Sequence, residues 1–304
     1  MIQNIDDIQL NFNSDNLWLI NLTLALIMFG VALDIKVSDF TNLLKSPKAV
    51  IVGIISQFIL IPLVTFILII IIKPPPSIAL GMMMVAACPG GNISNFMTKL
   101  AGGNAALSVS LTAFASFASL IMTPLNFAVW GSFYEPTSVI LRSVKVDPAE
   151  VAKLILLILG IPLVLGMLVN YYRTNFASKL SKILKPVSIL IFLAFIIVAF
   201  YNNLDIFMEH IHYVLFLVLL HNAVLLLVGF NFAKLNRLSY LDQKTLSIET
   251  GIQNAGLGLM LVFSFFSNLG GMALLVAFWA IWDIVSGLLI AYFWSEKSVK
   301  KVKT

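Results

Sequence analysis

The chain has 304 residues, of which 60% are hydrophobic and only 11% are charged. Soluble domains carry about 25% charged and about 45–50% apolar residues, so no water-soluble fold of this length could bury so many apolar side chains. This composition excludes a soluble enzyme, a nucleic-acid-binding protein and a disordered scaffold, and it predicts a polytopic membrane protein. The net charge of +5 does not indicate a nucleic-acid partner, because the basic residues are scattered through short loops. The single cysteine, Cys88, excludes a disulfide framework and a cysteine-based metal site.

A transmembrane helix needs roughly 20 predominantly apolar residues to cross the hydrocarbon core of a bilayer. The acidic start of the chain differs from the basic start of a secretory signal, so we expect the first apolar segment to be a retained span. In chain order, the sequence predicts nine spans, near residues 16–34, 47–72, 77–98, 104–130, 150–172, 186–203, 211–232, 239–269 and 272–295.

The basic residues also predict the orientation of the chain. If the basic C-terminal tail, residues 296–304, is cytoplasmic, most of the 19 Lys and Arg residues lie in cytoplasmic loops or in that tail. The opposite orientation would reverse this bias and violate the positive-inside rule. We therefore expect a multi-pass protein of the cell (inner) membrane, with residues 1–15 as an extracytoplasmic tail and the C-terminus inside.

Two of the predicted spans are interrupted near their middle. CPGGNISN at residues 88–95 interrupts span 77–98, because Pro-Gly-Gly cannot continue an α-helix, and IETGIQNAGLG at residues 248–258 interrupts span 239–269. Unsatisfied backbone groups in hydrocarbon cost several kcal/mol each, so such breaks persist only inside protein or beside a water-filled cavity. One break alone is equally consistent with a binding site and with a helix kink that neighbouring side chains fill. Interrupted helices in both halves of a chain, however, indicate the binding site of a transporter.

Glu249 and Asp283 are the acidic residues that lie well inside the predicted spans, away from their ends, and no Lys or Arg lies at a matching depth. A carboxylate with Asn, Gln, Ser and Thr oxygens nearby favours a small hard cation, and protonation of Glu249 is the competing alternative. Ser108 and Thr112 lie four residues apart on one helix face. Alone, this pair and Gln57 are more typical of hydrogen bonds within or between helices than of cation ligands.

Enzyme motifs are missing from the sequence. HEXXH, GXSXG and the P-loop signature do not occur, which argues against an intramembrane protease, an acyl hydrolase or an ATP-driven pump. His210, His212 and His221 do not have the spacing of a metal site. The sequence therefore predicts that the protein is not an enzyme.

The interrupted segments and the helices around them resemble a known family. CPGGNISNFMTKLAGGNAALSVSLTA and LSIETGIQNAGLGLML are similar to the two signature regions of the bile acid:sodium symporter family. The resemblance continues in order and spacing over nearly the whole chain after about residue 16. The matching segments are residues 26–40, 46–63, 88–113, 219–230 and 246–261.

This resemblance implies an all-α fold of two inverted five-helix repeats, in which two unwound helices cross. Bacterial members of the family usually have ten spans and animal members nine, and this chain would lack the first of the ten. By position, a panel domain would comprise residues 16–34 plus 150–203, and a core domain would comprise residues 47–130 plus 211–295.

The resemblance also implies two co-transported sodium ions beside the crossing point. Glu249 would serve both ions. The first sodium site would use Ser94, Asn95, Ser108, Thr112 and Glu249, and the second Gln57, Glu249, Gln253 and the carbonyls of Thr250 and Ile252.

Taken together, the sequence predicts a secondary active symporter that imports an organic anion with sodium by alternating access. We expect the anion, bile-acid-like or a small carboxylate, beside Asn92 and Asn254, where half-helix N-termini present positive dipole ends. The alternative is a proton-coupled carrier of a small organic acid that uses Glu249 or Asp283. The expected partners are the anion, sodium ions and the lipid bilayer, with no nucleic acid and no obligate protein partner.

Asp283 is where the resemblance gives least guidance. Some bacterial relatives read WHNISG where this chain reads WDIVSG, so Asp283 replaces a histidine beside the implied substrate cavity. We expect a mostly neutral carboxyl group that can donate a hydrogen bond to the substrate or to a hydroxyl of the core. A hydrogen bond to an opposed helix, without any substrate contact, is the alternative.

Overall fold

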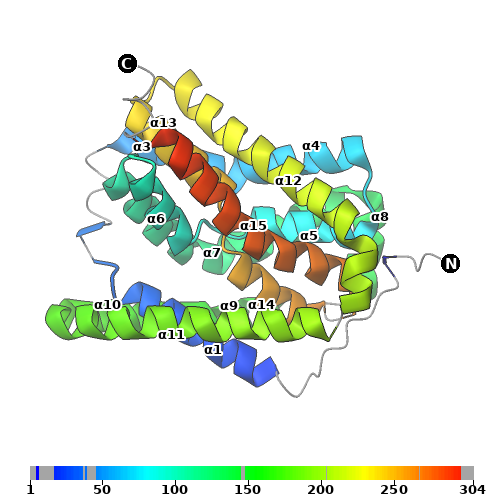
Figure 1. The fold of residues 1–304 in the computed structure, drawn as a ribbon, viewed down its shortest axis with the longest axis horizontal. Helices are drawn as coiled ribbons and strands as arrows, with labels where there is room; N and C mark the ends of the chain where they lie inside the picture. Colours follow the sequence, from blue (N-terminus) through cyan, green and yellow to red (C-terminus); the bar gives the residue numbers. More distant parts are fainter. Residues whose placement is uncertain are drawn as a thin grey trace.

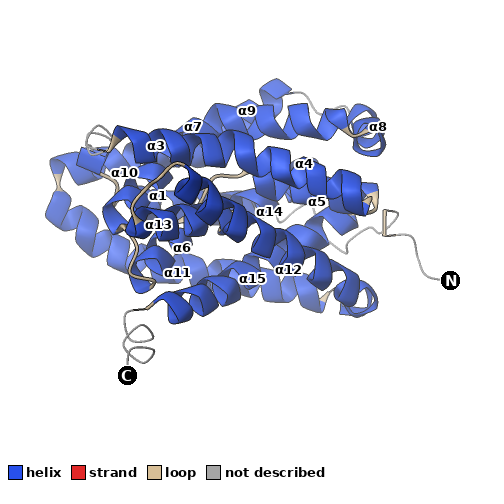
Figure 2. Ribbon diagram, turned by 90° about the horizontal axis from the view of Figure 1, so that it is seen from above, coloured by secondary structure: helices blue, strands red, loops and turns tan. Residues whose placement is uncertain are grey.

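The computed structural model describes residues 5–6, 17–36, 38–39, 46–144, 148–202, 204–266 and 268–295. Most of the predicted N-terminal tail and all of the predicted C-terminal tail lie outside the described residues. Within the described part every regular element is helical and none is a strand (Figure 2). The prediction of an all-α membrane protein is confirmed at this level.

The helices follow one another with short connections. Their bounds are α1 Leu17–Ala32, α3 Pro47–Ile55, η3 Ser56–Leu60, α4 Ile61–Ile72, α5 Pro76–Ala87, α6 Asn92–Leu100, α7 Ala105–Phe133, α8 Glu135–Val144, α9 Pro148–Ile155, η4 Leu156–Gly160, α10 Ile161–Tyr172, α11 Thr174–Tyr201, α12 Leu204–Leu235, α13 Tyr240–Gly251, α14 Ala255–Phe265 and α15 Gly270–Trp294.

Two of the long helices contain a widened, π-helical turn. The stretches η3 and η4 end two residues before Pro62 and Pro162. Proline lacks the amide hydrogen that an α-helix needs at that position, and a π-turn absorbs the lost bond without ending the helix. Residues 47–72 therefore remain one continuous helical segment.

By length and composition, five helical segments of the described chain could cross a membrane. Their outer surfaces carry large apolar side chains, such as Ile71 and Ile121, which are 71% and 72% exposed. Water does not tolerate such surfaces on long helices, but lipid does. The five segments are Pro47–Ile72, Ala105–Phe133, Lys153–Tyr172, Met208–Leu235 and Gly270–Trp294, and shorter apolar helices cover Asn21–Ala32, Pro76–Ala87 and Ala255–Phe265.

Some element boundaries differ from those predicted. Residues 174–185, expected in a loop, form the first part of α11. Their lysines and serines are polar, but they include no helix-breaking residue before Pro186, so the helix begins directly after Arg173. Helix α8 was also not predicted from the sequence. Its first turn carries Glu135 and its last turn carries Arg142, and an acid at the N-terminus and a base at the C-terminus stabilise a helix through its dipole.

The helices pack in two neighbouring groups (Figure 1). Helix α1 packs against α10 and α11 along one edge, while α12 packs against α13 and α15, and α5 against α7 and α15. Contacts of α1 with α14, and of α7 with α9, join the groups. The division into panel and core domains stays a prediction.

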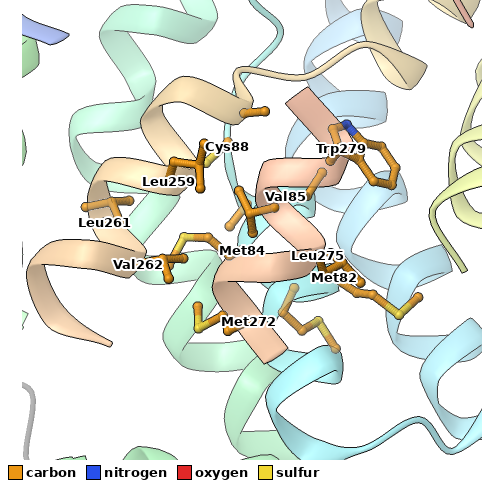
Figure 3. Packing of buried hydrophobic residues seen from close by; sticks show 14 of the residues in the cluster. Met82, Met84, Val85, Cys88, Leu259, Leu261, Val262, Met272, Leu275 and Trp279 are labelled. Carbon is orange, nitrogen blue, oxygen red and sulfur yellow. The ribbon is translucent and has the colours of Figure 1, made fainter. Parts of the chain in front are cut away.

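The largest apolar core lies where α5, α14 and α15 meet (Figure 3). Met84 and Val85 of α5 lie between Val262 of α14 and Leu275 of α15, and all four side chains are buried. This packing fixes the two half-helices α5 and α14, whose inner ends carry the candidate site.

Candidate functional site

The two interruptions predicted from the sequence lie side by side. Helix α5 ends at Ala87 before α6 begins at Asn92, and α13 ends at Gly251 before α14 begins at Ala255. Gly90 and Gln253 form an isolated antiparallel bridge, and the backbone amide of Asn254 donates to the carbonyl of Pro89 over 2.8 Å. The two unwound segments thus satisfy part of each other's backbone, as a break at membrane depth requires.

Four helix ends meet at this pair of segments, which we call the crossover (residues 88–91 and 252–254). Helices α5 and α13 end there with carbonyl groups, and α6 and α14 begin there with amide groups. Helix C-termini favour cations and helix N-termini favour anions. The crossover can therefore attract ligands of both signs.

The carboxylate of Glu249 lies beside the crossover and is surrounded by hydroxyl groups. Ser94 and Ser108 donate to its Oε1, with a distance of 2.7 Å from Ser94 Oγ, and Thr112 donates to its Oε2 over 3.0 Å. The side-chain carbonyl of Asn95 lies 2.7 Å from Ser108 Oγ and 3.1 Å from Thr112 Oγ1. The five side chains predicted for the first sodium site are therefore in one cluster, which we call the Glu249 cluster.

The hydroxyl groups of this cluster have more oxygen neighbours than they have hydrogens to donate. Ser108 Oγ has a single hydrogen but lies within hydrogen-bonding distance of Glu249, of Asn95 and of Thr98 Oγ1 at 3.3 Å. Thr112 Oγ1 likewise has two acceptor neighbours. Oxygens gathered in this way, one of them a carboxylate, fit a hard cation that accepts their lone pairs.

The chemistry of the cluster also argues against a transition metal. Among the residues that the structure describes, no group of three or more His, Cys, Asp and Glu side chains could hold a metal ion. Neutral hydroxyl and amide oxygens around one carboxylate suit an alkali or alkaline-earth cation better than zinc or copper.

The residues predicted for the second sodium site are also adjacent. In this structure, however, their backbone carbonyls accept hydrogen bonds from side-chain amide nitrogens. Gln253 Nε2 donates to the carbonyls of Thr250 over 2.7 Å and Glu249 over 3.2 Å. Gln57 Nε2 donates to Gln253 Oε1 over 3.2 Å and to the carbonyl of Cys88 over 3.0 Å. The carbonyl oxygen of Ile252 lies close to Gly90, 3.7 Å from where a Cβ atom on that glycine would stand. In this conformation the polar groups satisfy one another.

The residues predicted to contact substrate have different environments. Asn254 Oδ1 accepts from the amide of Leu257 over 3.1 Å, so this side chain caps α14. Asp283 Oδ2 accepts from the backbone amide of Gln253 over 3.0 Å, while its Oδ1 is buried and has no hydrogen-bond partner among the described residues. The side chain of Asn92 lies outside the described residues. Asp283 therefore touches the crossover itself.

Several polar residues at the crossover were not predicted from the sequence. Asn222 Nδ2 donates to the carbonyl of Gly251 over 2.8 Å, which satisfies the end of α13. The hydroxyls of Ser56 and Thr250 lie 2.9 Å apart, and Thr123 Oγ1 donates to the carbonyl of Ala87 over 2.9 Å. Buried Asn and Thr side chains inside long apolar spans were the available signal, but such residues occur in many membrane helices.

Comparison with known proteins gives the family. The family model described as the sodium bile acid symporter family matches residues 21–210. The chain is 34% identical over 282 residues to an uncharacterized sodium-dependent transporter, YocS, of Bacillus subtilis, covering 93% of this chain and 84% of the relative. It is 28% identical over 294 residues to the probable chloroplastic sodium/metabolite cotransporter BASS1 of Arabidopsis thaliana (96% and 70%), and 28% identical over 238 residues to a sodium-dependent organic anion transporter of Bos taurus (77% and 60%).

These relatives carry the names of transporters and cotransporters rather than of enzymes. Their similarity extends through both interrupted helices, because the Bacillus and Arabidopsis matches cover more than nine-tenths of this chain. This multi-pass membrane protein belongs to the sodium bile acid symporter family, a family of sodium-dependent transporters.

Proposed function

We propose that this protein is a symporter that uses a sodium gradient to import an organic anion by alternating access. The observation that carries the proposal is the Glu249 cluster, in which hydroxyl and amide oxygens surround a carboxylate without a basic partner among the described residues. A sodium ion would replace the unsatisfied oxygen contacts with favourable ones.

Two sodium ions bind in this proposal, with different demands on the protein. The Glu249 cluster already presents its oxygens. The second site needs both side-chain amides to turn. The nitrogen of Gln253 must leave the carbonyls of Glu249 and Thr250, and the nitrogen of Gln57 must leave the carbonyl of Cys88 and the Gln253 oxygen. We therefore expect the first ion to bind before the second.

The anion binds at the positive ends of α6 and α14. The bovine relative is named as an organic anion transporter, and a helix N-terminus is a general binding site for a carboxylate. Asn92 and Asn254 stand at these two N-termini, and Asp283 accepts a hydrogen bond from the backbone amide of Gln253, the residue before Asn254. Ordering of the crossover by sodium would complete this site, which couples the two ligands.

Transport follows when the core domain, residues 47–130 plus 211–295, rocks against the panel domain, residues 16–34 plus 150–203. The crossover then opens to one side of the membrane at a time. In the cell (inner) membrane, the excess of basic residues in alternate loops favours an external N-terminus and a cytoplasmic C-terminus.

Thr112→Val tests the cluster, because valine keeps the shape of threonine and removes its oxygen. Sodium-dependent thermal stabilisation of the purified protein in lipid nanodiscs gives the half-saturating sodium concentration, with potassium as the reference cation. We expect this concentration to rise at least tenfold, because a hydrogen-bonding contact to a charged group is worth about 1.5–3 kcal/mol.

Ser119→Ala is the matched control, because this buried hydroxyl on the same helix donates to the carbonyl of Ser116 over 2.7 Å and to no other described residue. Its sodium response should equal that of the wild type. An unchanged response in Thr112→Val would refute the site. Stabilisation by acidic pH in place of sodium would favour the proton-coupled alternative through Glu249 or Asp283.

A further inference from the structure

A second feature of the molecule lies away from the Glu249 cluster. A cavity of about 360 Å³ lies between α5, α7, α8 and α14. Ligand pockets in proteins span roughly 300–1,000 Å³, are mostly apolar and contain a few polar groups. The cavity is lined by Met84, Thr123, Pro124, Phe127, Ala128, Ser132, Ser138, Leu141, Arg142, Leu261, Phe265 and Phe266.

Among the described residues that line the cavity, Arg142 in the last turn of α8 is the one cationic group. Its Nη2 donates to Ser138 Oγ over 2.6 Å and its Nε lies 3.3 Å from the carbonyl of Ser138. These contacts hold the guanidinium at the wall of the cavity, and Nη1 makes no hydrogen bond to another residue that the structure describes. No carboxylate of the described residues pairs with Arg142, so its positive charge is available to a ligand.

The cavity and the Glu249 cluster lie at two levels of one helix. Helix α7 contributes Ser108 and Thr112 to the cluster and, 11 residues beyond Thr112, Thr123 to the cavity, which corresponds to about 16 Å along the axis. Thr123 Oγ1 donates to the carbonyl of Ala87, the last residue of α5 before the crossover. The inner end of the cavity is therefore hydrogen-bonded to the backbone that leads into the crossover.

We propose that this cavity is a binding site for a small monocarboxylate with an apolar body, and that Arg142 binds the carboxylate group. The guanidinium has a planar set of donors that matches a carboxylate. The apolar wall would leave a second charged group of a dicarboxylate unpaired, which disfavours such ligands. The volume lies at the small end of the pocket range, which favours an aryl or medium-chain acid over a steroid-sized one.

This site deepens the proposed function, because it names the class of anion that the protein admits on the α8 side of the crossover. It does not require sodium, since no residue of the Glu249 cluster lines the cavity. A binding measurement without sodium therefore separates a failure of this site from a failure of sodium coupling.

The test uses 3-(4-fluorophenyl)propanoate as the probe, with its uncharged amide as the reference compound. The full chain is placed in nanodiscs of zwitterionic lipid in potassium buffer, and fluorine NMR line broadening reports binding relative to empty nanodiscs. We expect saturable binding of the carboxylate to the wild type. Arg142→Gln should weaken it at least tenfold, Arg142→Lys should weaken it less, and the amide should bind both forms equally.

Two further variants complete the test. Arg173→Gln removes an exposed arginine at the junction of α10 and α11, at the opposite end of the helices from α8 in Figure 1, and should leave binding unchanged. Ala128→Leu adds volume to the wall and should reduce binding of both compounds. Equal binding of the carboxylate to wild type and Arg142→Gln would overturn the proposal, as would an absence of binding beyond that of empty nanodiscs.

Discussion

Gly90 provides a sharp test of the Glu249 cluster, because the backbone of the crossover approaches the carboxylate closely there. A Cβ atom at Gly90 would lie 2.9 Å from Glu249 Oε2 and 3.4 Å from the Glu249 carbonyl. In Gly90→Ala the carboxylate must move by a few tenths of an ångström, away from the methyl group and from its hydrogen-bonding position beside Thr112. Loss of one hydrogen bond to a charged group costs about 1.5–3 kcal/mol, so sodium affinity should fall roughly ten- to a hundredfold.

The next residue supplies the control. At Gly91 an added Cβ would meet nothing closer than 3.6 Å, and the backbone φ of −107° suits any residue. Sodium-dependent thermal stabilisation of Gly90→Ala and Gly91→Ala in nanodiscs should therefore differ, with Gly91→Ala close to the wild type. If both variants responded to sodium like the wild type, the close approach of the crossover to Glu249 would have no role in cation binding.

Three further predictions concern one residue each in α13, in the crossover and in α15. Lys244 Nζ donates to the carbonyls of Ala101 and Trp294, each over 2.9 Å. Lys244→Met should therefore destabilise the fold by about 3 kcal/mol and lower the thermal unfolding temperature by roughly 5 °C or more. An unchanged unfolding temperature would contradict this structural role. Gln253→Leu should lower the Hill coefficient of sodium-dependent uptake toward one, whereas a coefficient equal to the wild type's would remove Gln253 from the second site. Asp283→Asn should retain substantial uptake in proteoliposomes, because an amide oxygen can still accept from the Gln253 amide, and complete loss would mean that a permanent negative charge is needed.

The two helix breaks were predictable because their causes are local. Pro89 with Gly90 and Gly91 cannot continue α5, and the glycine at position 251 comes at the end of α13. The acid at position 249 was also recognisable, since a carboxylate within an apolar span needs a partner.

The geometry of the site could not be predicted in the same way. Ser108 and Thr112 reach Glu249 from a helix more than 130 residues earlier, and their hydroxyls would be equally compatible with bonds inside their own helix. The role of Asn254 as the N-cap of α14 was open to prediction from its place before a helix. Cavity-forming contacts, such as those around Arg142, depend on the unpredicted helix α8.

Loop boundaries were the least predictable part of the fold. The polar side chains at residues 174–185 suggested a loop. Helix α11 nevertheless runs through them, because this stretch contains no proline or glycine that would break a helix. The π-turns of η3 and η4 follow from Pro62 and Pro162, but the choice between a kink and a widened turn depends on the neighbours that pack around each proline.

Direct sodium binding tests the central claim most simply. Equilibrium binding of radioactive sodium to the purified protein in nanodiscs should be saturable in the wild type, insensitive to excess potassium, and lost in Glu249→Gln while the circular dichroism spectrum is retained. Binding to Glu249→Gln with the stoichiometry and affinity of the wild type would contradict the assignment of the Glu249 cluster as a sodium site.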